Sequence, residues 1–418
     1  MLYRLAYGHT YQELELDPAQ VRAVLAPRSV EGIMDVPEET RHSLREPFAS
    51  PPLNVLLDSQ QSALLVTVDN TRPSPREMLE PILDACQKRN VTPTVCIANG
   101  RHRAMSKEEL HEHLGQRIMT GARVIQHDAN DRSIFRDLGV TSLGTDILIN
   151  KVVFEHDVVI GVGYIEPTYL LGWSGGRKLM LPGLAHAESI NNNHYYITDP
   201  DARIGKMDGN PLSDDSEEFM RQIPFHFITY AVAGPDDQAV KIVSGDPFDA
   251  HREICRQARG IYEVEKETAP VVICSAGGTP YDCDLVQGKK SVVSGEQVVE
   301  PGGCIIMLAE CPEGFGAEGT FKEWLRSKAP EEVARDIKKR QMFDLGAHGA
   351  YILARPIVEK DAHVILVTNP ELRSALHGSY VQTAADLPEA WELACRYCGD
   401  EPDVTICKKA RRLICTDE

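Results

Sequence analysis

The stretch DVVIGVGYIEPTYLLGWSGGRKLMLPGLAHAESINNNH, residues 157–194, carries both a fold signal and a chemical one. Its start, DVVIGV, is a continuous apolar run of the kind that forms a buried strand in a parallel sheet. A Ser-Gly-Gly turn and the pair Arg177 and Lys178 follow. Glycines let backbone N–H groups gather around an anion, and the two cations add charge. The stretch predicts a strand followed by an anion-binding loop; the alternative is a surface loop with solvated charges.

Two side chains of this loop are candidates for reactive chemistry. A lysine beside a glycine turn can bind phosphate or act as a nucleophile, so Lys178 is a candidate for either role. His194 ends an Asn-Asn-Asn-His run 16 residues later and can fold back as a metal ligand or a base. The loop is neither a Walker A motif nor a Gly-x-Gly-x-x-Gly fingerprint, so no general motif identifies its ligand.

The same strand-and-loop pattern occurs twice earlier in the chain. Apolar runs at 63–69 and 92–98 each lead into a charged loop, at 69–72 and 101–103. Ser74–Glu77 and Ser106–Glu109 have the spacing of capping boxes and predict that a helix follows each loop, the first starting at Pro75. In a doubly wound sheet, loops beyond the carboxyl ends of the strands build the ligand site. Three charged loops at strand ends therefore predict one shared site.

A second unit is predicted after the charged, proline-ended linker 263–270. Apolar runs at 271–274, 302–308 and 362–368 predict strands, and a helix carries Gln287 and Lys290 on one face at i and i+3. The fold class is α/β, with two α/β domains whose largely parallel sheets flank an active-site cleft. We expect an N-terminal domain over 1–265, to which 400–418 returns, and a C-terminal domain over 266–399, joined by a hinge.

Composition restricts the partners of the chain. Of its 418 residues, 42% are hydrophobic and 25% charged, which is typical of a globular protein, and its net charge is −18. Nucleic acid and anionic membranes bind basic surfaces, so neither is expected as a partner. The chain opens without a signal peptide, lacks a membrane-spanning run and has 11 cysteines without a regular framework, which predicts a cytoplasmic location. Cys395, Cys398, Cys407 and Cys415 are either a zinc site or unrelated thiols on a helix end and two strands.

Taken together, the loops resemble the nickel-pincer lactate racemase family of 2-hydroxyacid racemases and epimerases. The resemblance covers nearly the whole chain. It rests on the following motifs: DNTRP (69–73), ANGRHR (98–103), IEPTYLLGWSGGRKLMLPG (165–183), NNNH ending at 194, SAGGTPYDCDLVQGKK (275–290) and GGCIIMLAECPEGFG (302–316).

The resemblance implies a cofactor and its ligands. The cofactor is a nickel-pincer nucleotide, of the Ni(II) pyridinium-3,5-bisthiocarboxylic acid mononucleotide type, made by dedicated biosynthesis enzymes. Lys178 would hold it covalently and His194 would be the protein ligand to nickel. The nucleotide would contact the loop residues Asp69, Asn70, Thr71 and Arg72. The chemistry implied is removal and return of a hydride at the α-carbon of a small 2-hydroxyacid.

The resemblance also implies substrate contacts. His102 would be the acid/base, Gln287 and Lys290 would bind the substrate hydroxyl and carboxylate, and Arg72 would also face the substrate. His348, near a family position that lines the substrate pocket, is either a second base or a histidine on a helix surface. His186 is expected to be a solvated turn residue.

One departure from the family pattern concerns the second acid/base. The family motif usually reads Glu-Pro-His, whereas this chain reads Glu166-Pro167-Thr168, and Tyr164 stands where histidine is common. Threonine is not a base near neutral pH, but its hydroxyl can bind an extra substrate hydroxyl. The sequence therefore predicts an isomerase, a racemase or 2-epimerase of a 2-hydroxyacid other than lactate. The alternative is a non-catalytic homologue that binds the cofactor or a hydroxyacid.

Overall fold

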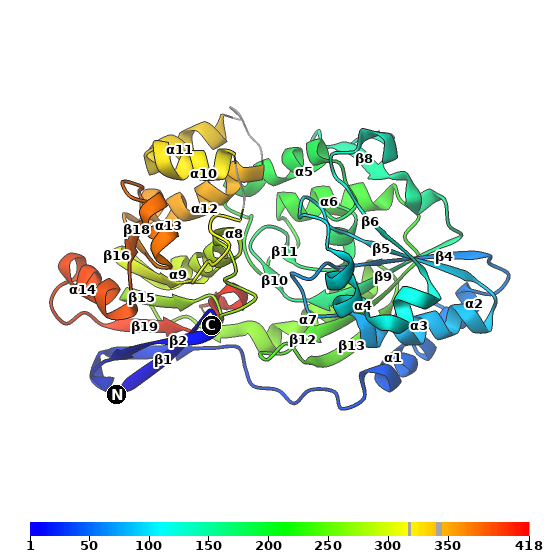
Figure 1. Ribbon diagram of the computed structural model, residues 1–418, viewed down its shortest axis with the longest axis horizontal. Coiled ribbons are helices and arrows are strands. Elements are labelled where there is room, and N and C mark those ends of the chain that lie inside the picture. The colour runs from blue at the N-terminus through cyan, green and yellow to red at the C-terminus, as the bar shows by residue number, and fades with distance from the viewer. Residues whose placement is uncertain (317–318, 340–344, 418) are drawn as a thin grey trace. The chain divides into compact units, whose positions relative to one another are not determined.

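A computed structural model describes residues 1–316, 319–339 and 345–417 of the chain (Figure 1). The chain divides into two compact units, one formed by Ser29–Ile261 and the other by Met1–Arg28 together with Tyr262–Glu418. Each unit is built around its own six-stranded sheet. This confirms the predicted α/β class with largely parallel sheets. Within the described ranges, no helix has both the length and the apolar character needed to cross a membrane.

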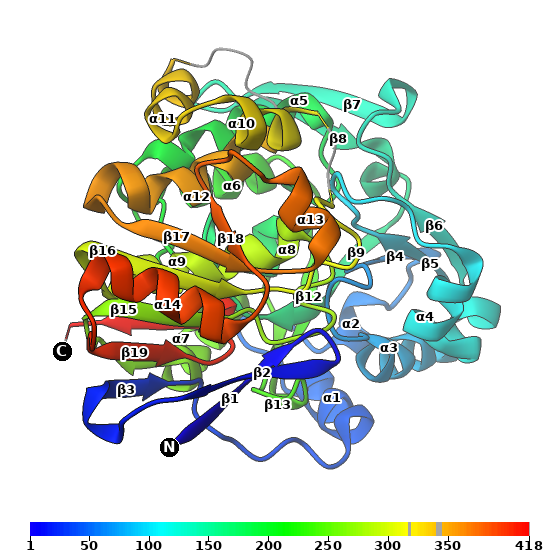
Figure 2. The same cartoon turned by 60° about the vertical axis from the view of Figure 1, so that its left-hand side comes forward.

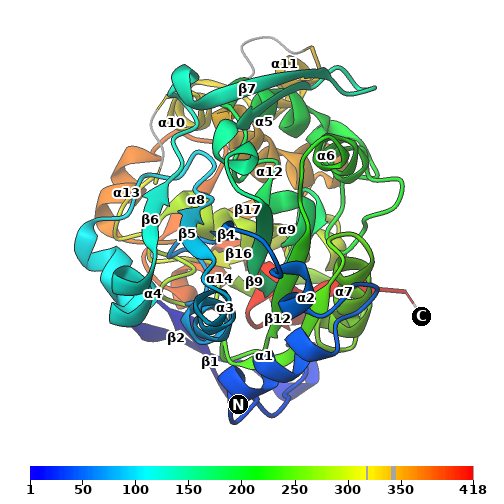
Figure 3. The ribbon, with the colours of Figure 1, turned by 90° about the vertical axis from the view of Figure 1, so that its right-hand side faces the viewer.

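The sheet of the unit 29–261 has the strand order β13-β12-β9-β4-β5-β6 (Figure 3). Its strands are β4 (Ser62–Thr67), β5 (Thr92–Ile97), β6 (Arg123–Gln126), β9 (Val158–Ile165), β12 (Phe227–Ala233) and β13 (Ala239–Gly245). All neighbours pair in parallel except β12 and β13. The continuous apolar runs seen in the sequence are β4, β5 and β9, and they are the central strands because both of their faces are buried.

Three helices of this unit share a core with its sheet: α1 (Val36–Arg45), α3 (Arg76–Lys88) and α4 (Lys107–Gly121). The predicted capping box at Ser106 is confirmed, since Ser106 and Glu109 cap each other's backbone N–H groups. The capping box predicted at Ser74 is wrong. Pro75 is the N-cap of α3, and the Ser74 hydroxyl donates instead to the His113 carbonyl at 2.6 Å, because α3 begins one residue later than the pattern suggested.

The unit has further elements besides this sheet and the three helices. They are α2 (Leu53–Leu56), the hairpin of β7 (Phe135–Val140) and β8 (Asp146–Asn150), the short pair β10 (Pro167–Thr168) and β11 (Gly172–Trp173), the 3₁₀ helix η4 (Gly176–Leu179), α5 (Ala187–His194), α6 (Pro211–Arg221) and α7 (Asp249–Tyr262). The glycine turn predicted before Lys178 is present. Gly175 and Gly176 both have positive φ, and a side chain at Gly176 would collide with His251.

The second sheet is wholly parallel and has the order β18-β17-β16-β15-β19-β3 (Figure 2). Its strands are β3 (Val21–Leu25), β15 (Ala269–Ser275), β16 (Val299–Leu308), β17 (His363–Val367), β18 (Gln382–Ala384) and β19 (Val404–Cys407). The hairpin of β1 (Leu2–Tyr7) and β2 (Thr10–Glu15) packs with α14 (Leu387–Cys398) in one core cluster. The remaining elements are α8 (Leu285–Gly288), η6 (Lys289–Ser291), α9 (Val292–Val298), α10 (Thr320–Ser327), α11 (Pro330–Lys338), α12 (Leu345–Lys360), α13 (Pro370–Ala375), β14 (Glu263–Glu265) and β20 (Ile414–Thr416).

The strand pairing of this sheet corrects the predicted domain boundaries. The segment 400–418 was expected to return to an N-terminal domain over 1–265. Instead β19 is inserted between β15 and β3, and β20 pairs with β14. Both chain ends therefore belong to the unit that contains 262–418. The reason is the hydrogen-bond ladder: β3 and β19 satisfy the backbone groups at this edge of the sheet.

The sequence left two readings of four cysteines, a zinc site or thiols on a helix end and two strands, and their positions match the second. Cys395 and Cys398 lie on α14, Cys407 lies on β19 and Cys415 on β20. These thiols are free, and among the described residues they do not form a group with metal-ligand spacing.

The Ser106 cap is testable by substitution. We expect Ser106→Ala to lower the free energy of unfolding by about 1 kcal/mol, because the Glu109 backbone N–H loses its acceptor at the start of α4. The measurement is urea unfolding followed by circular dichroism. Thr120→Ala at the other end of α4 is the matched control, since that hydroxyl only donates to carbonyls of its own helix, and a change within about 0.5 kcal/mol is expected. Equal effects of the two substitutions would contradict the capping role.

Candidate functional site

The predicted convergence of charged loops is present in the unit 29–261. Strands β9, β4 and β5 are parallel neighbours, so their carboxyl ends lie at one edge of the sheet. The loop after β4 contacts both of its neighbours. Asp69 Oδ2 lies 2.6 Å from His102 Nδ1 in the loop after β5, and Arg72 Nε lies 2.8 Å from Glu166 Oε1 in the loop after β9. The three loops are thereby fixed to one another.

Asp69 sets the orientation of His102. The Asp69 carboxyl is buried, which by itself raises its pKa, but the charge and hydrogen bond of His102 and the Thr71 hydroxyl together lower that pKa well below its usual range. Thr71 donates to Asp69 Oδ1 from both its backbone and its hydroxyl. A carboxylate held in this way fixes the Nδ1 side of the His102 ring, which leaves Nε2 as the nitrogen for proton exchange. This arrangement suits an acid/base.

Lys178 and His194 are near each other in the same unit. Burial is the largest cause that lowers the pKa of His194 to about 3, and the positive charges of Lys178 and Arg101 lower it further. The His194 imidazole is therefore neutral at physiological pH, which is the form that binds a metal. His194 is the last residue of α5, and Lys178 lies on η4 directly after the glycine turn. The arrangement can hold an anionic group beside Lys178 and a metal at His194.

Arg177 does not add its charge beside Lys178, as the sequence had suggested. Its guanidinium is 3% exposed and donates to the Leu171 carbonyl at 3.2 Å. Burial lowers its pKa, and the groups that oppose this shift include Cys255 and Glu217. In a 3₁₀ helix successive side chains point about 120° apart, so neighbours in sequence face different surroundings. Arg177 thus stabilises the base of the loop rather than a ligand.

Thr168, which replaces the expected histidine, lies on β10 and is buried. Its Oγ1 has no hydrogen-bond partner within the described structure. A buried hydroxyl without a partner costs free energy, so its presence points to a group that arrives with a ligand. Tyr164 has a different role: its hydroxyl donates to the Ser74 carbonyl at 3.3 Å, and burial raises its pKa to about 12. Tyr164 is therefore part of the packing between β9 and α3.

In the other unit, Gln287 and Lys290 face each other as predicted. Lys290 Nζ donates to Gln287 Oε1 at 2.5 Å. Asp284 caps the helix α8 that carries Gln287, accepting its backbone N–H at 2.7 Å. An amide and an ammonium group held together in this way can bind a hydroxyl and a carboxylate of one small molecule.

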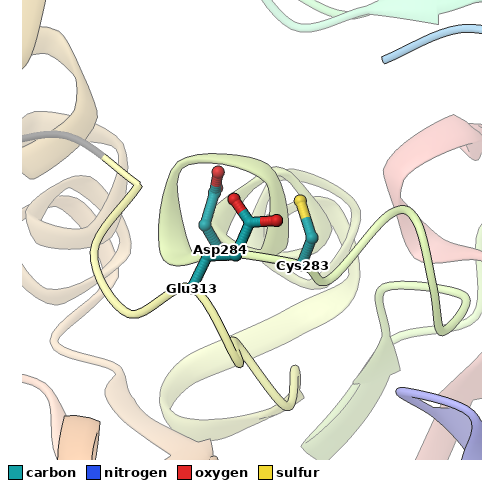
Figure 4. A group of neighbouring side chains, drawn as sticks. All are labelled: Cys283, Asp284 and Glu313. Carbon is teal, nitrogen blue, oxygen red and sulfur yellow. The ribbon is translucent and has the colours of Figure 1, made fainter. Parts of the chain in front are cut away.

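Cys283, Asp284 and Glu313 form a neighbouring acidic group, shown in Figure 4. Their ligand atoms all lie within 4.8 Å of one another. Burial is the largest cause that raises the pKa of the Cys283 thiol to about 12, and Asp284 and Glu313 raise it further. The thiol is therefore protonated at neutral pH and is a poor nucleophile and metal ligand. With Asp284 engaged as a helix cap, this group is best explained as structural.

The structure corrects the expectation for His186 and decides between the two readings of His348. His186 was expected to be a solvated turn residue, but it is buried and is the N-cap of α5, where its ring accepts the Glu188 backbone N–H at 3.2 Å. His348 lies on α12 and is 7% exposed, so it is not on a helix surface. Sequence periodicity does not show which polar side chains will be covered by other parts of the chain, so the burial of these two histidines was not predicted.

Two buried polar residues of the unit 29–261, Asn193 and Asp215, were not singled out from sequence, whereas Lys289 of the other unit was considered only as one of several cations in glycine- or proline-containing segments. Lys289 is fully buried, and burial lowers its pKa to about 8. Asn193 and Asp215 are buried and bonded to each other at 2.8 Å. The run of three asparagines before His194 is the feature of the sequence that could have drawn attention to Asn193. Lys289 and Asp215 lie among other charged residues in the sequence, and only burial separates them from solvated ones.

A pocket in the unit 29–261 is unsuited to an anionic substrate. Its lining includes the carboxylates of Asp199, Asp201, Asp214, Asp215 and Glu218. Burial is the largest cause that raises the pKa of Asp214, with the Asp208 charge next. Such a surface repels a hydroxyacid carboxylate. The strand-end loops are therefore a better candidate site for an anionic ligand than this pocket.

Comparison with known proteins finds relatives over nearly the whole chain. Residues 7–205 match the family model described as lactate racemase N-terminal domain, and residues 264–414 match that described as lactate racemase C-terminal domain. A lactate racemase of Thermoanaerobacterium thermosaccharolyticum is 29% identical over 96% of each chain, and one of Lactiplantibacillus plantarum is 30% identical over 88% of each. The apoprotein structure of a lactate racemase from T. thermosaccharolyticum superposes with a TM-score of 0.93, with 28% identity and complete coverage of both chains.

The matching family models, the relatives and the shared fold together define a racemase-type isomerase built from two α/β units. The chain belongs to the lactate racemase family. The family resemblance drawn from the loop motifs is confirmed.

The Arg72–Glu166 pair gives a test of how the loops are held. Its two side chains are 11% and 2% exposed, so Arg72→Met leaves a buried carboxylate without this partner. We expect a loss of about 3–5 kcal/mol in the free energy of unfolding, measured by urea denaturation. Arg103→Met is the control: Arg103 is 65% exposed in its pair with Glu109, and a loss below about 1 kcal/mol is expected. Similar losses in both variants would contradict the importance of the buried pair.

Proposed function

We propose that this chain is a nickel-pincer-nucleotide-dependent racemase or 2-epimerase of a 2-hydroxyacid bulkier than lactate. The observation that carries the proposal is the cluster at the ends of β9, β4 and β5, where the oriented base His102 and the neutral ligand His194 occur with Lys178. In this cluster His102 would serve as the base, His194 as the metal ligand and Lys178 as the anchoring amine, which are the protein groups that such chemistry requires.

The residues present fit the cofactor. A soft, sulfur-ligated nickel accepts an imidazole ligand, and His194 offers a buried, neutral one. Lys178 would hold the nucleotide covalently, and the loop Asp69–Arg72 would contact it, with Asn70 and Thr71 supplying hydrogen-bonding groups. When bound, the cofactor would supply the acceptor for a hydride from the substrate α-carbon. The biosynthesis enzymes that make this cofactor are the protein partners implied.

The side chains of the chain would handle binding and proton transfer. Lys290 would bind the substrate carboxylate, and Gln287 would hold the hydroxyl. His102 would accept the hydroxyl proton at Nε2, and Asp69 would stabilise the resulting imidazolium through Nδ1. The same histidine would return the proton once the α-carbon has passed through its planar state. His348, buried on α12, is the candidate for the second base.

Thr168 supports a substrate larger than lactate. Its buried hydroxyl has no partner among the described residues, and a substrate hydroxyl would supply one. Threonine is also smaller than histidine, which frees volume for a longer substrate. The same substitution favours the second candidate function, a homologue that binds cofactor or hydroxyacid without turnover, because it removes a base. A panel of chiral 2-hydroxyacids offered to the cofactor-loaded protein separates the two: turnover of any member supports the enzyme.

Covalent attachment at Lys178 has a direct test. Protein produced together with the cofactor-synthesis enzymes is expected to carry a mass adduct, and Lys178→Ala is expected to abolish it because the anchoring amine is gone. Intact-mass spectrometry makes the measurement. Lys151→Ala is the control, since Lys151 is exposed and bonds the Ser133 carbonyl. Persistence of the adduct in Lys178→Ala would overturn the assignment.

Substrate preference is tested at Thr168 and His102. We expect little lactate racemisation by the unmodified loaded protein, measured by circular dichroism of the product mixture, and a gain in Thr168→His because a second imidazole is restored. His102→Ala is expected to lower turnover of the preferred substrate by about 10²–10⁴-fold. His156→Ala, remote from these loops and bonded to the Val152 carbonyl, is the control. Efficient lactate racemisation by the unmodified protein would refute the substrate assignment.

A further inference from the structure

A chain of buried hydrogen bonds leads from α6 to His194. Asn193, which precedes His194 on α5, donates from Nδ2 to the Leu212 carbonyl at 3.0 Å and to Asp215 Oδ2 at 2.8 Å. A third contact, to Ser216 Oγ, is 3.3 Å. On the other side of the amide, Asn193 Oδ1 lies 3.2 Å from His194 Nδ1. The side chain of Asn193 therefore connects α6 to the imidazole of His194.

These partners decide which way the Asn193 amide points. A carbonyl and a carboxylate only accept hydrogen bonds, so the group between Leu212 and Asp215 must be the NH₂. The amide oxygen then faces His194. Because an amide oxygen also only accepts, His194 Nδ1 must carry the hydrogen. An imidazole whose single N–H is at Nδ1 keeps a lone pair on Nε2.

Asp215 is itself held from a third element. Thr141, at the end of the β7–β8 hairpin turn, donates its hydroxyl to Asp215 Oδ1 at 2.5 Å, and Thr145 donates to Oδ2 at 2.9 Å. Asp215 is 1% exposed, so water does not compete for these bonds. The carboxylate has a donor on each oxygen and cannot rotate without losing one. The Ile190 backbone, one turn earlier on α5, is a further acceptor for the His194 ring.

We propose that Asn193 and Asp215 are positioning residues that fix His194 in the Nδ1–H tautomer and so present Nε2 to the metal. This inference rests on the proposed function, in which His194 is the nickel ligand. The physical basis is general: a metal-ligating histidine donates its other N–H to an acceptor that fixes ring and tautomer, and loss of that acceptor costs about 10–100-fold in metal affinity. Here the acceptor is an amide whose own orientation is set by a buried carboxylate.

The tautomer is measured first, on unmodified protein without cofactor. Selective ¹⁵N-histidine labelling and two-bond ¹H–¹⁵N correlation report the protonated ring nitrogen, with His194→Ala used to assign the signal. The Nδ1–H form is expected. Observation of the Nε2–H form in the unmodified protein would overturn the proposal before any variant of Asn193 or Asp215 is made. Because this readout needs no nickel, it stands even if the Lys178 adduct is absent and the proposed function fails.

Variants then test the chain of contacts. Asn193→Ala removes one acceptor of the His194 ring and leaves the Ile190 backbone, and it is expected to shift the His194 signal toward the Nε2–H form or a mixture of tautomers. In protein loaded with cofactor, it is expected to release nickel to a chelator about 10–100-fold faster, with the Lys178 adduct mass unchanged. Asp215→Asn keeps the size and an acceptor oxygen, and a smaller change in the same direction is expected. Melting curves show that each variant is folded.

Asn192→Ala is the matched control. Asn192 belongs to the same asparagine run, but its side chain donates to Asp146 Oδ2 at 3.2 Å instead of bonding the histidine. It is expected to keep the tautomer and the nickel-release rate of the unmodified protein. Wild-type tautomer and nickel retention in Asn193→Ala would overturn the proposal, as would equal losses in Asn192→Ala and Asn193→Ala.

Discussion

The parallel ladder of β9, β4 and β5 is the constraint on which the site depends. Parallel strands end at one edge of a sheet, so their following loops are brought together although they lie far apart in sequence. The hydrogen bond between Asp69 and His102 and the ion pair between Arg72 and Glu166 then fix the neighbouring loops to the β4 loop. The ladder itself is held by backbone hydrogen bonds and apolar burial.

Burial rather than residue type determines what each charged group in these loops does. Arg177 and Lys178 are adjacent and both cationic, yet the first is buried against the Leu171 carbonyl while the charge of the second acts on His194. The same desolvation keeps the His194 imidazole neutral and therefore able to bind a metal. In a protein with a net charge of −18, these local environments are what separate a site for an anion from the acidic surface around it.

Replacing a histidine by Thr168 changes the site in two ways at once. It removes a titratable base, and it leaves a buried hydroxyl that has no partner among the described residues. Under the proposed function, the first change would lower the capacity for symmetric proton transfer, and the second would favour a substrate with a hydroxyl beyond the single one of lactate. Family membership and substrate preference are therefore separate questions. The long sequence motifs identify the family, whereas the side chain of Thr168 bears on the substrate.

The sequence by itself determined the central strands, the glycine turn before Lys178 and the cap at Ser106, because these depend on local periodicity and local backbone geometry. The family followed from motifs at fixed positions. Only the tertiary structure placed 400–418 beside 1–28, since strand pairing joins segments distant in sequence. It alone decided the burial of Arg177 and joined Asn193 to Asp215, because desolvation and hydrogen-bond partners arise only when separate elements pack together.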